Sequence, residues 1–100
     1  MQEKRGHPRV PIQLRATCHR ASGGSFVAQV VNVSVGGMFL NSAEVLQFGE
    51  ELTIELELPR ARAPLRLPAI VRWTLAEGFG VQFGLLGARD THALVELTRG

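Results

Sequence analysis

Residues 52–58 alternate strictly between aliphatic and polar side chains, in the order Leu-Thr-Ile-Glu-Leu-Glu-Leu. In a β-strand a period of two puts every aliphatic residue on one face, whereas a helix would scatter them around its axis. The segment is therefore predicted to be a strand with one face buried. That buried face requires a sheet to cover it.

The same alternation recurs along the chain, for example over residues 10–18, where Cys18 falls on the apolar face. Gly-rich or polar turns separate the segments, and residues 41–49 form a connection that is either a wide turn or a short helical piece. Pro68 indicates an edge or a bulge in its strand. Strands are expected at residues 10–19, 26–35, 38–40, 52–58, 65–75 and 79–85.

Six antiparallel strands leave no exposed edge if they close, so the predicted fold class is all-β, a six-stranded antiparallel β-barrel over residues 10–86. Asp90 is expected to cap a short C-terminal helix over residues 88–99, with Leu94 and Leu97 on its buried side. Such a short helix must dock on the barrel to be stable. Residues 1–9 are expected to form a flexible N-terminal arm, and a length of 100 residues predicts one domain.

Composition excludes several classes of protein. With 11 basic and 9 acidic residues, the net charge of +2 is too even for a non-specific nucleic-acid binder. The single cysteine excludes an internal disulfide and fits the cytoplasm. No apolar run is long enough for membrane insertion, and nothing resembles an export signal.

Residues 32–37, Asn-Val-Ser-Val-Gly-Gly, carry the first candidate site. In an extended strand, Asn32 and Ser34 share one face and the valines the other. Gly36 and Gly37 can adopt positive φ and let a ligand approach the backbone. This combination suits a polar, planar ligand, although Asn32 and Ser34 can also simply solvate a strand before a turn.

The second candidate site is in the arm, at residues 4–9, Lys-Arg-Gly-His-Pro-Arg. Pro8 disfavours helical angles at His7, so Arg5 and Arg9 lie in an extended arm that can wrap around a ligand. Guanidinium groups bind phosphates in a fork and stack on flat rings. The alternative is a solvated basic tail.

Together, Arg5-x-x-x-Arg9 and Asn32-x-Ser34-x-x-Gly37 resemble the motifs of the PilZ family, bacterial receptors for cyclic di-GMP. Val71-Arg72-Trp73 and Gly80-Val81-Gln82-Phe83 are similar to the family's closing hairpin. The resemblance implies that Arg5 and Arg9 hold the phosphates and stack on guanine. It also implies that Asn32 and Ser34 contact the ligand, while Gly36 and Gly37 keep the approach open.

On this resemblance the chain is a cytoplasmic receptor whose arm closes over the barrel on binding and regulates an unidentified effector protein in motility, pilus or exopolysaccharide output. Lys4 precedes the first motif arginine, at a position that influences whether one ligand or an intercalated pair binds. Trp73 is an accessory candidate for stacking on a base, with a core position as the alternative. The sequence leaves the partner, the ligand stoichiometry and the oligomeric state open.

No catalytic or metal site is expected. His7, His19 and His92 are far apart in sequence, and Ser34 lacks the Gly-x-Ser-x-Gly context of a nucleophile. We therefore expect no enzyme activity and no cofactor beyond the ligand itself. Two other functions remain as alternatives: a ligand-independent adaptor that acts by protein contact, and a small barrel that binds single-stranded nucleic acid.

Overall fold

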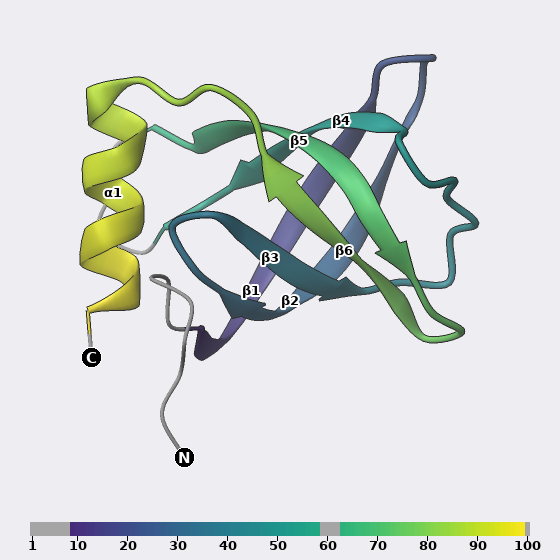
Figure 1. The fold of residues 1–100 in the computed structure, drawn as a ribbon, viewed down its shortest axis with the longest axis horizontal. Coiled ribbons are helices and arrows are strands. Elements are labelled where there is room, and N and C mark those ends of the chain that lie inside the picture. The colour runs from purple at the N-terminus through teal and green to yellow at the C-terminus, as the bar shows by residue number, and fades with distance from the viewer. Residues whose placement is uncertain (1–8, 59–62, 100) are drawn as a thin grey trace.

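The computed structural model describes residues 9–58 and 63–99, whose six strands are antiparallel and close into a barrel (Figure 1). The strands follow one another around the barrel in the order β1-β2-β3-β6-β5-β4. The predicted barrel and C-terminal helix are confirmed, while the predicted arm, except for Arg9, lies outside the described residues. The elements are β1 (Val10–Arg20), β2 (Ser25–Val33), β3 (Gly37–Asn41), β4 (Glu51–Leu56), β5 (Leu65–Thr74), β6 (Gly78–Phe83) and α1 (Ala88–Thr98).

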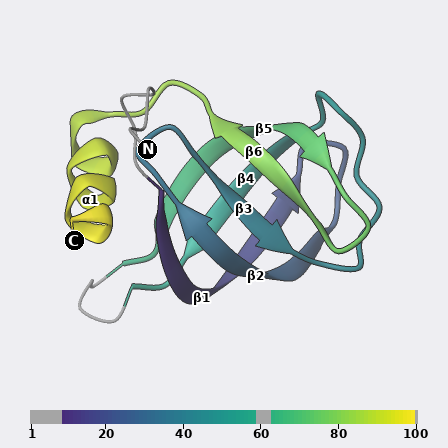
Figure 2. The ribbon, with the colours of Figure 1, turned by 60° about the horizontal axis from the view of Figure 1, so that its bottom comes forward.

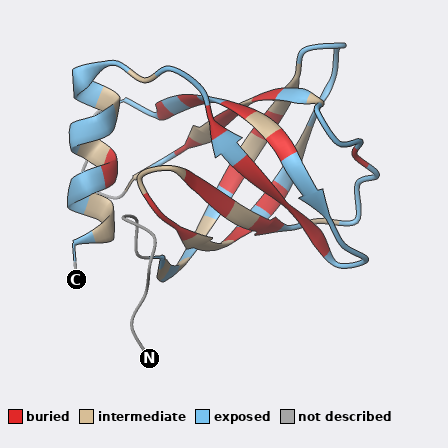
Figure 3. Cartoon of the chain, viewed as in Figure 1, coloured by how far each residue is buried: buried red, intermediate tan, exposed pale blue. Residues whose placement is uncertain are grey.

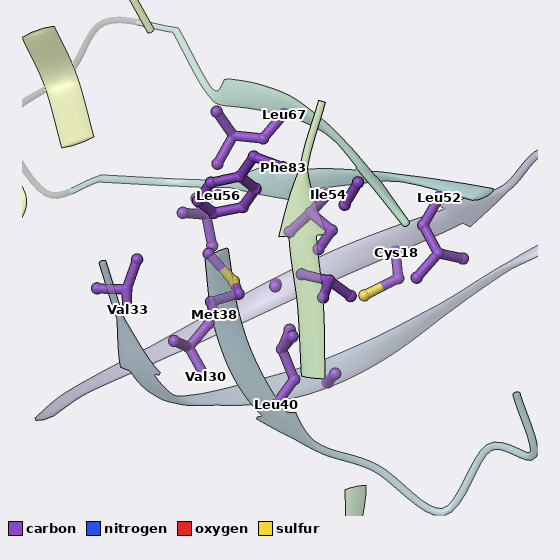
Figure 4. Packing of buried hydrophobic residues seen from close by; sticks show 14 of the residues in the cluster. Cys18, Val30, Val33, Met38, Leu40, Leu52, Ile54, Leu56, Leu67 and Phe83 are labelled. Carbon is purple, nitrogen blue, oxygen red and sulfur yellow. The ribbon is translucent and has the colours of Figure 1, made fainter. Parts of the chain in front are cut away.

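The apolar positions of the alternating segments fill the barrel, as Figures 3 and 4 show. In β4, Leu52, Ile54 and Leu56 are buried, as their period of two predicts. Every strand contributes buried side chains to one continuous core in the interior of the barrel. Fully buried side chains include Cys18, Val30, Val33, Met38, Leu40, Leu67, Val71, Phe79 and Val81.

Two β-bulges change which side chains face outward. In β2, Val30 pairs with Leu40 but Asn32 pairs with Phe39, so Val31 is an extra residue. In β5, Arg72 is extra in the same way, between the partners of Val81 and Gly80 in β6. Because each bulge adds one residue, the inward and outward positions are exchanged from that point along the strand.

Pro68 lies within β5, where the register with β4 is regular, so of the two alternatives expected for Pro68, an edge or a bulge, the bulge is excluded. It pairs with Thr53 of β4 on one side. On the other side β6 ends opposite Ala69, and only the Pro68 carbonyl is used, accepting a hydrogen bond from the Gly84 amide at 2.8 Å. The missing N–H of Pro68 therefore faces past the end of β6, which agrees with the expected edge position.

Residues 42–50 form an irregular connection between β3 and β4 at one end of the barrel (Figure 1), which resolves the prediction in favour of a wide turn. Arg20 fastens it, with its Nε donating to Glu50 Oε2 at 2.6 Å and its Nη1 donating to Glu44 Oε1 at 3.0 Å. The Arg20 hydrogen bond lowers the pKa of Glu50. Leu46 from this connection is buried in the core.

At the other end of the barrel, α1 packs against the core through Leu94, with Leu97 partly buried beside it (Figure 2). The docking is as predicted, but the cap is wrong: the N-cap is Gly87, without a side-chain hydrogen bond, and Asp90 lies inside the first turn. There its charge still complements the helix dipole. Among the described residues, no helix has the length and hydropathy needed to cross a bilayer.

Burial removes Cys18 from ordinary thiol chemistry. Its side chain is inaccessible to solvent, and this desolvation raises its pKa to about 12 from its usual 9.0. We expect the native protein not to react with a thiol reagent at pH 8, and one thiol per chain to react after denaturation. Because the unfolded thiol ionises first, the stability of the fold should also decrease as the pH rises from about 9 to 12. Rapid native labelling would contradict this burial.

Candidate functional site

A surface groove of about 470 Å³ lies on the wall of the barrel formed by β2, β3, β6 and β5. Its volume is within the range of small-molecule sites in proteins. The groove is lined by Arg9, Asn32, Ser34, Gly36, Met38, Phe39, Trp73, Gly80 and Gln82. Five of these residues were predicted as site residues, and they come from three separate parts of the sequence.

The strand register explains how distant residues meet in this groove. Asn32 of β2 pairs with Phe39 of β3, Phe39 pairs with Gly80 of β6, and Gly80 pairs with Trp73 of β5. Paired residues on the same face of a sheet have neighbouring side chains. These four residues therefore form one row across the outer wall. The four strands that carry them, β2, β3, β6 and β5, are labelled in Figure 2.

The two bulges aim the ends of this row outward. If the alternation ran through Val31 without a bulge, Asn32 would lie two residues after Val30 and continue the inward series of Ala28 and Val30. If it ran through Arg72 without a bulge, Trp73 would likewise follow Val71 into the core. Trp73 is instead 54% exposed and lines the groove, so a core position for this residue is wrong, while its accessory role in ligand binding stays a prediction.

Gly80 makes room for the Trp73 ring. A Cβ at Gly80 would lie only 2.5 Å from Cε3 of Trp73. The indole therefore rests directly against the backbone of β6, and the exposed part of the ring, 54% of the residue, is open to a ligand. An exposed aromatic face in a groove is suited to stacking on a flat heterocycle.

Arg9 and Asn32 form a hydrogen bond at the other end of the row. Nη1 of Arg9 donates to Oδ1 of Asn32 at 2.9 Å. Since guanidinium is always charged and can only donate, it fixes the amide with its oxygen toward Arg9. The remaining N–H groups of Arg9 and the NH₂ group of Asn32 are donors suited to an anionic or acceptor-rich ligand.

Ser34 does not occupy the predicted position. Strand β2 ends at Val33, and Ser34 is 3% exposed in the turn that follows. Its Oγ accepts hydrogen bonds from the amides of Gly36 at 3.1 Å and Gly37 at 3.2 Å. The Ser34 hydroxyl thus shapes the turn beside the groove, whereas the prediction placed it on the strand face beside Asn32.

Gly36 and Gly37 also act differently from the prediction. Among the described glycines, positive φ occurs only at Gly23, Gly24 and Gly49. Gly37 is buried, does not line the groove, and must lack a Cβ because one would collide with the carbonyl oxygen of Val81 in β6. Close packing of β3 on β6 therefore requires this glycine. Gly36, in contrast to Gly37, lines the groove, and its role toward a ligand stays a prediction.

Lys4 and Arg5 lie outside the described residues, so their predicted roles stay predictions. The residues of the groove that were not predicted are Met38, Phe39, Gly80 and Gln82. Phe39 and Gln82 alternate with core residues of their own strands, which is a signal of outward orientation. Only the register shows that they face the same groove as Asn32.

Ser34→Ala should reduce stability because it removes the acceptor of two amides in a buried turn. We expect the free energy of unfolding to fall by about 1 to 3 kcal/mol in urea denaturation. Ser42→Ala is the matched control, since Ser42 Oγ accepts one amide hydrogen bond, from Glu44, in an exposed turn. Its effect should be smaller. Equal stability of Ser34→Ala and wild type would contradict the role of this hydroxyl.

The groove offers hydrogen-bond donors, a permanent positive charge and an aromatic face. Within residues 9–58 and 63–99, no three His, Cys, Asp or Glu side chains are grouped closely enough to hold a metal ion. The donors, the charge and the aromatic face of the groove can bind and orient a ligand, most suitably one that combines planar rings with anionic oxygens.

The sequence matches the family model of the PilZ domain over residues 3–100. No curated protein matches it significantly. Solved structures are similar at low sequence identity and so share the fold. The inhibitor of motility MotI/DgrA of Bacillus subtilis has a TM-score of 0.81 and 20% identity, over 97% of this chain and 50% of that chain.

Two structures with bound ligand are also similar. The PilZ domain of YcgR from Escherichia coli, with c-di-GMP, has a TM-score of 0.79 and 14% identity, over 96% of this chain and 89% of that chain. The MrkH–c-di-GMP complex of K. pneumonia has a TM-score of 0.77 and 14% identity, over 96% and 50%. This chain thus spans half the length of MotI/DgrA and of MrkH.

Proposed function

The chain belongs to the PilZ domain family, and on that basis we propose that it is a receptor for cyclic di-GMP that binds in the groove beside Arg9. One observation carries the proposal: Arg9, Asn32 and Trp73, from three distant parts of the sequence, line the same groove. Relatives with the same fold contain this ligand. Its two guanines and two phosphates match an aromatic face beside a guanidinium group.

Each side chain has a proposed role. Arg9 pairs with a phosphate or stacks on a guanine, with Asn32 holding its guanidinium at 2.9 Å. Trp73 stacks on a base, and Gly36 leaves the turn open to the ligand. Arg5 is proposed to hold a phosphate and stack on guanine together with Arg9, and Lys4 to influence whether one ligand or an intercalated pair binds. Ser34 and Gly37 act indirectly, by fixing the turn and the β3–β6 packing.

Trp73 allows a direct test, because it is the only tryptophan in the chain. Titration with cyclic di-GMP should change its fluorescence saturably, while GTP at the same concentration should change it much less. Trp73 lines the groove and lies next to Gly80 at one end of the row, so a signal from this residue reports on the groove itself. A flat fluorescence response together with an unchanged thermal midpoint would refute binding at this site.

We further propose that the receptor is cytoplasmic and not an enzyme, and that it acts on an effector protein through residues 1–9 and the barrel of residues 10–86. On this proposal, ligand draws the N-terminal residues onto the barrel and creates a surface for the effector. Hydrogen exchange of residues 4–10 should become slower when cyclic di-GMP is added. Identical protection with and without ligand would refute the switch but not the binding.

A further inference from the structure

Gln82 is a groove residue whose amide is held from outside the groove. It lies in β6 opposite Gly37 of β3, and its side chain is exposed. Nε of Arg72, the bulge residue of β5, donates to Oε1 of Gln82 at 2.9 Å. This hydrogen bond therefore links Gln82, which lines the groove, to Arg72 of the neighbouring strand β5, which does not line it.

The chemistry of this contact fixes which end of the amide is free. A guanidinium group carries only donors, so the group that Gln82 turns toward Arg72 must be its carbonyl oxygen. The NH₂ group of Gln82 therefore remains free, and it can donate hydrogen bonds but cannot accept them. At this position the groove therefore presents donors and penalises a ligand that places another donor there.

Arg72 is itself held in place by a second contact. Its guanidinium carbon lies 5.8 Å from the centroid of the Phe48 ring, in the connection between β3 and β4. Phe48 is 71% exposed, yet its connection is fixed to the barrel, since the Gly49 amide donates to the Val71 carbonyl at 2.8 Å. Contacts with Phe48 and Gln82 together restrict the rotation of the arginine.

We propose that Gln82 is a specificity-determining residue of the groove and that Arg72 positions it, so that the site selects guanine over adenine. Guanine presents two acceptors, O6 and N7, on one edge, where adenine presents an amino donor beside N7. The free NH₂ group of Gln82 complements the first edge and opposes the second. This inference rests on the proposed binding of cyclic di-GMP in the same groove.

The test is the ratio of affinities for cyclic di-GMP and cyclic di-AMP, measured by calorimetry on wild type and three variants. Gln82→Met keeps the length of the side chain but removes its donors. Arg72→Ala leaves Gln82 in place but lets its amide turn over. We expect each to reduce the preference for the guanine ligand about five- to tenfold. Phe48→Ala, outside the groove, should reduce it by a smaller factor.

Gln29→Met is the matched control, because Gln29 is an exposed glutamine of β2 that does not line the groove. Its ratio should equal that of wild type, and thermal melting should show all four variants folded. Suppose that wild type binds cyclic di-GMP and that Gln82→Met and Arg72→Ala both show the same ratio of affinities for the two ligands as wild type. The inference is then wrong, while the proposed function stands. If wild type binds neither ligand, both fail.

Discussion

Gly37→Ala should destabilise the barrel by about 3 kcal/mol or more, at the upper end of what overpacking costs. The added Cβ would collide with the Val81 carbonyl oxygen of β6. Strand β3 cannot move away, because it is paired with β2 on its other side. Since a small domain is stable by only about 5 to 15 kcal/mol, a change of this size should be plain in urea or thermal denaturation.

Gly84→Ala is the control for this substitution. There the new Cβ would lie 3.7 Å from the Pro68 side chain, which is an ordinary contact. We expect its stability to stay within about 1 kcal/mol of wild type. Two glycine variants of equal stability would show that β3 and β6 are not packed as closely as the structure has them.

Arg9→Ala should weaken the binding of cyclic di-GMP at least tenfold and by up to about a hundredfold, because a charge-assisted hydrogen bond contributes about 1.5 to 3 kcal/mol. The substitution removes the guanidinium that faces the groove and its hydrogen bond to Asn32. Stability should change by less than about 0.5 kcal/mol, since Arg9 is exposed. Ligand titration and thermal melting of the same preparation measure both effects.

The matched control is Arg15→Ala, which removes an exposed arginine of β1 that does not line the groove. Both variants lose one positive charge, so a difference between their affinities reports the position of Arg9 and not the net charge. Equal loss of affinity in the two variants would mean that the ligand responds only to the overall charge. Full affinity of Arg9→Ala would remove Arg9 from the site.

The fold could be predicted from the sequence because its strands alternate with a period of two, and that period is a property of single segments. The prediction of Leu52, Ile54 and Leu56 as core residues is confirmed on this ground. The position of Trp73 could not be predicted in the same way. It follows Val71 by two residues, and only the bulge at Arg72 turns it outward.

The candidate site, like the position of Trp73, could be predicted from the sequence only in part. Asn32 was expected on the surface and does line the groove, but Ser34 was assigned to the strand face because the end of β2 at Val33 leaves no mark in the alternation. Gly37 is required because a Cβ there would collide with the carbonyl oxygen of Val81, which is more than forty residues away in sequence. Contacts between distant strands, such as the one that brings Gln82 to the groove, depend on register and require the structure.

Binding of cyclic di-GMP itself is the central claim, and calorimetric titration of the wild-type chain at about physiological salt tests it most directly. We expect saturable heat with a Kd in the submicromolar to micromolar range, where 1 μM corresponds to a binding free energy of about −8 kcal/mol. GTP should give no such heat. The fitted ratio of ligand to protein also decides between one ligand and an intercalated pair. No heat and no thermal shift at millimolar cyclic di-GMP would contradict the claim.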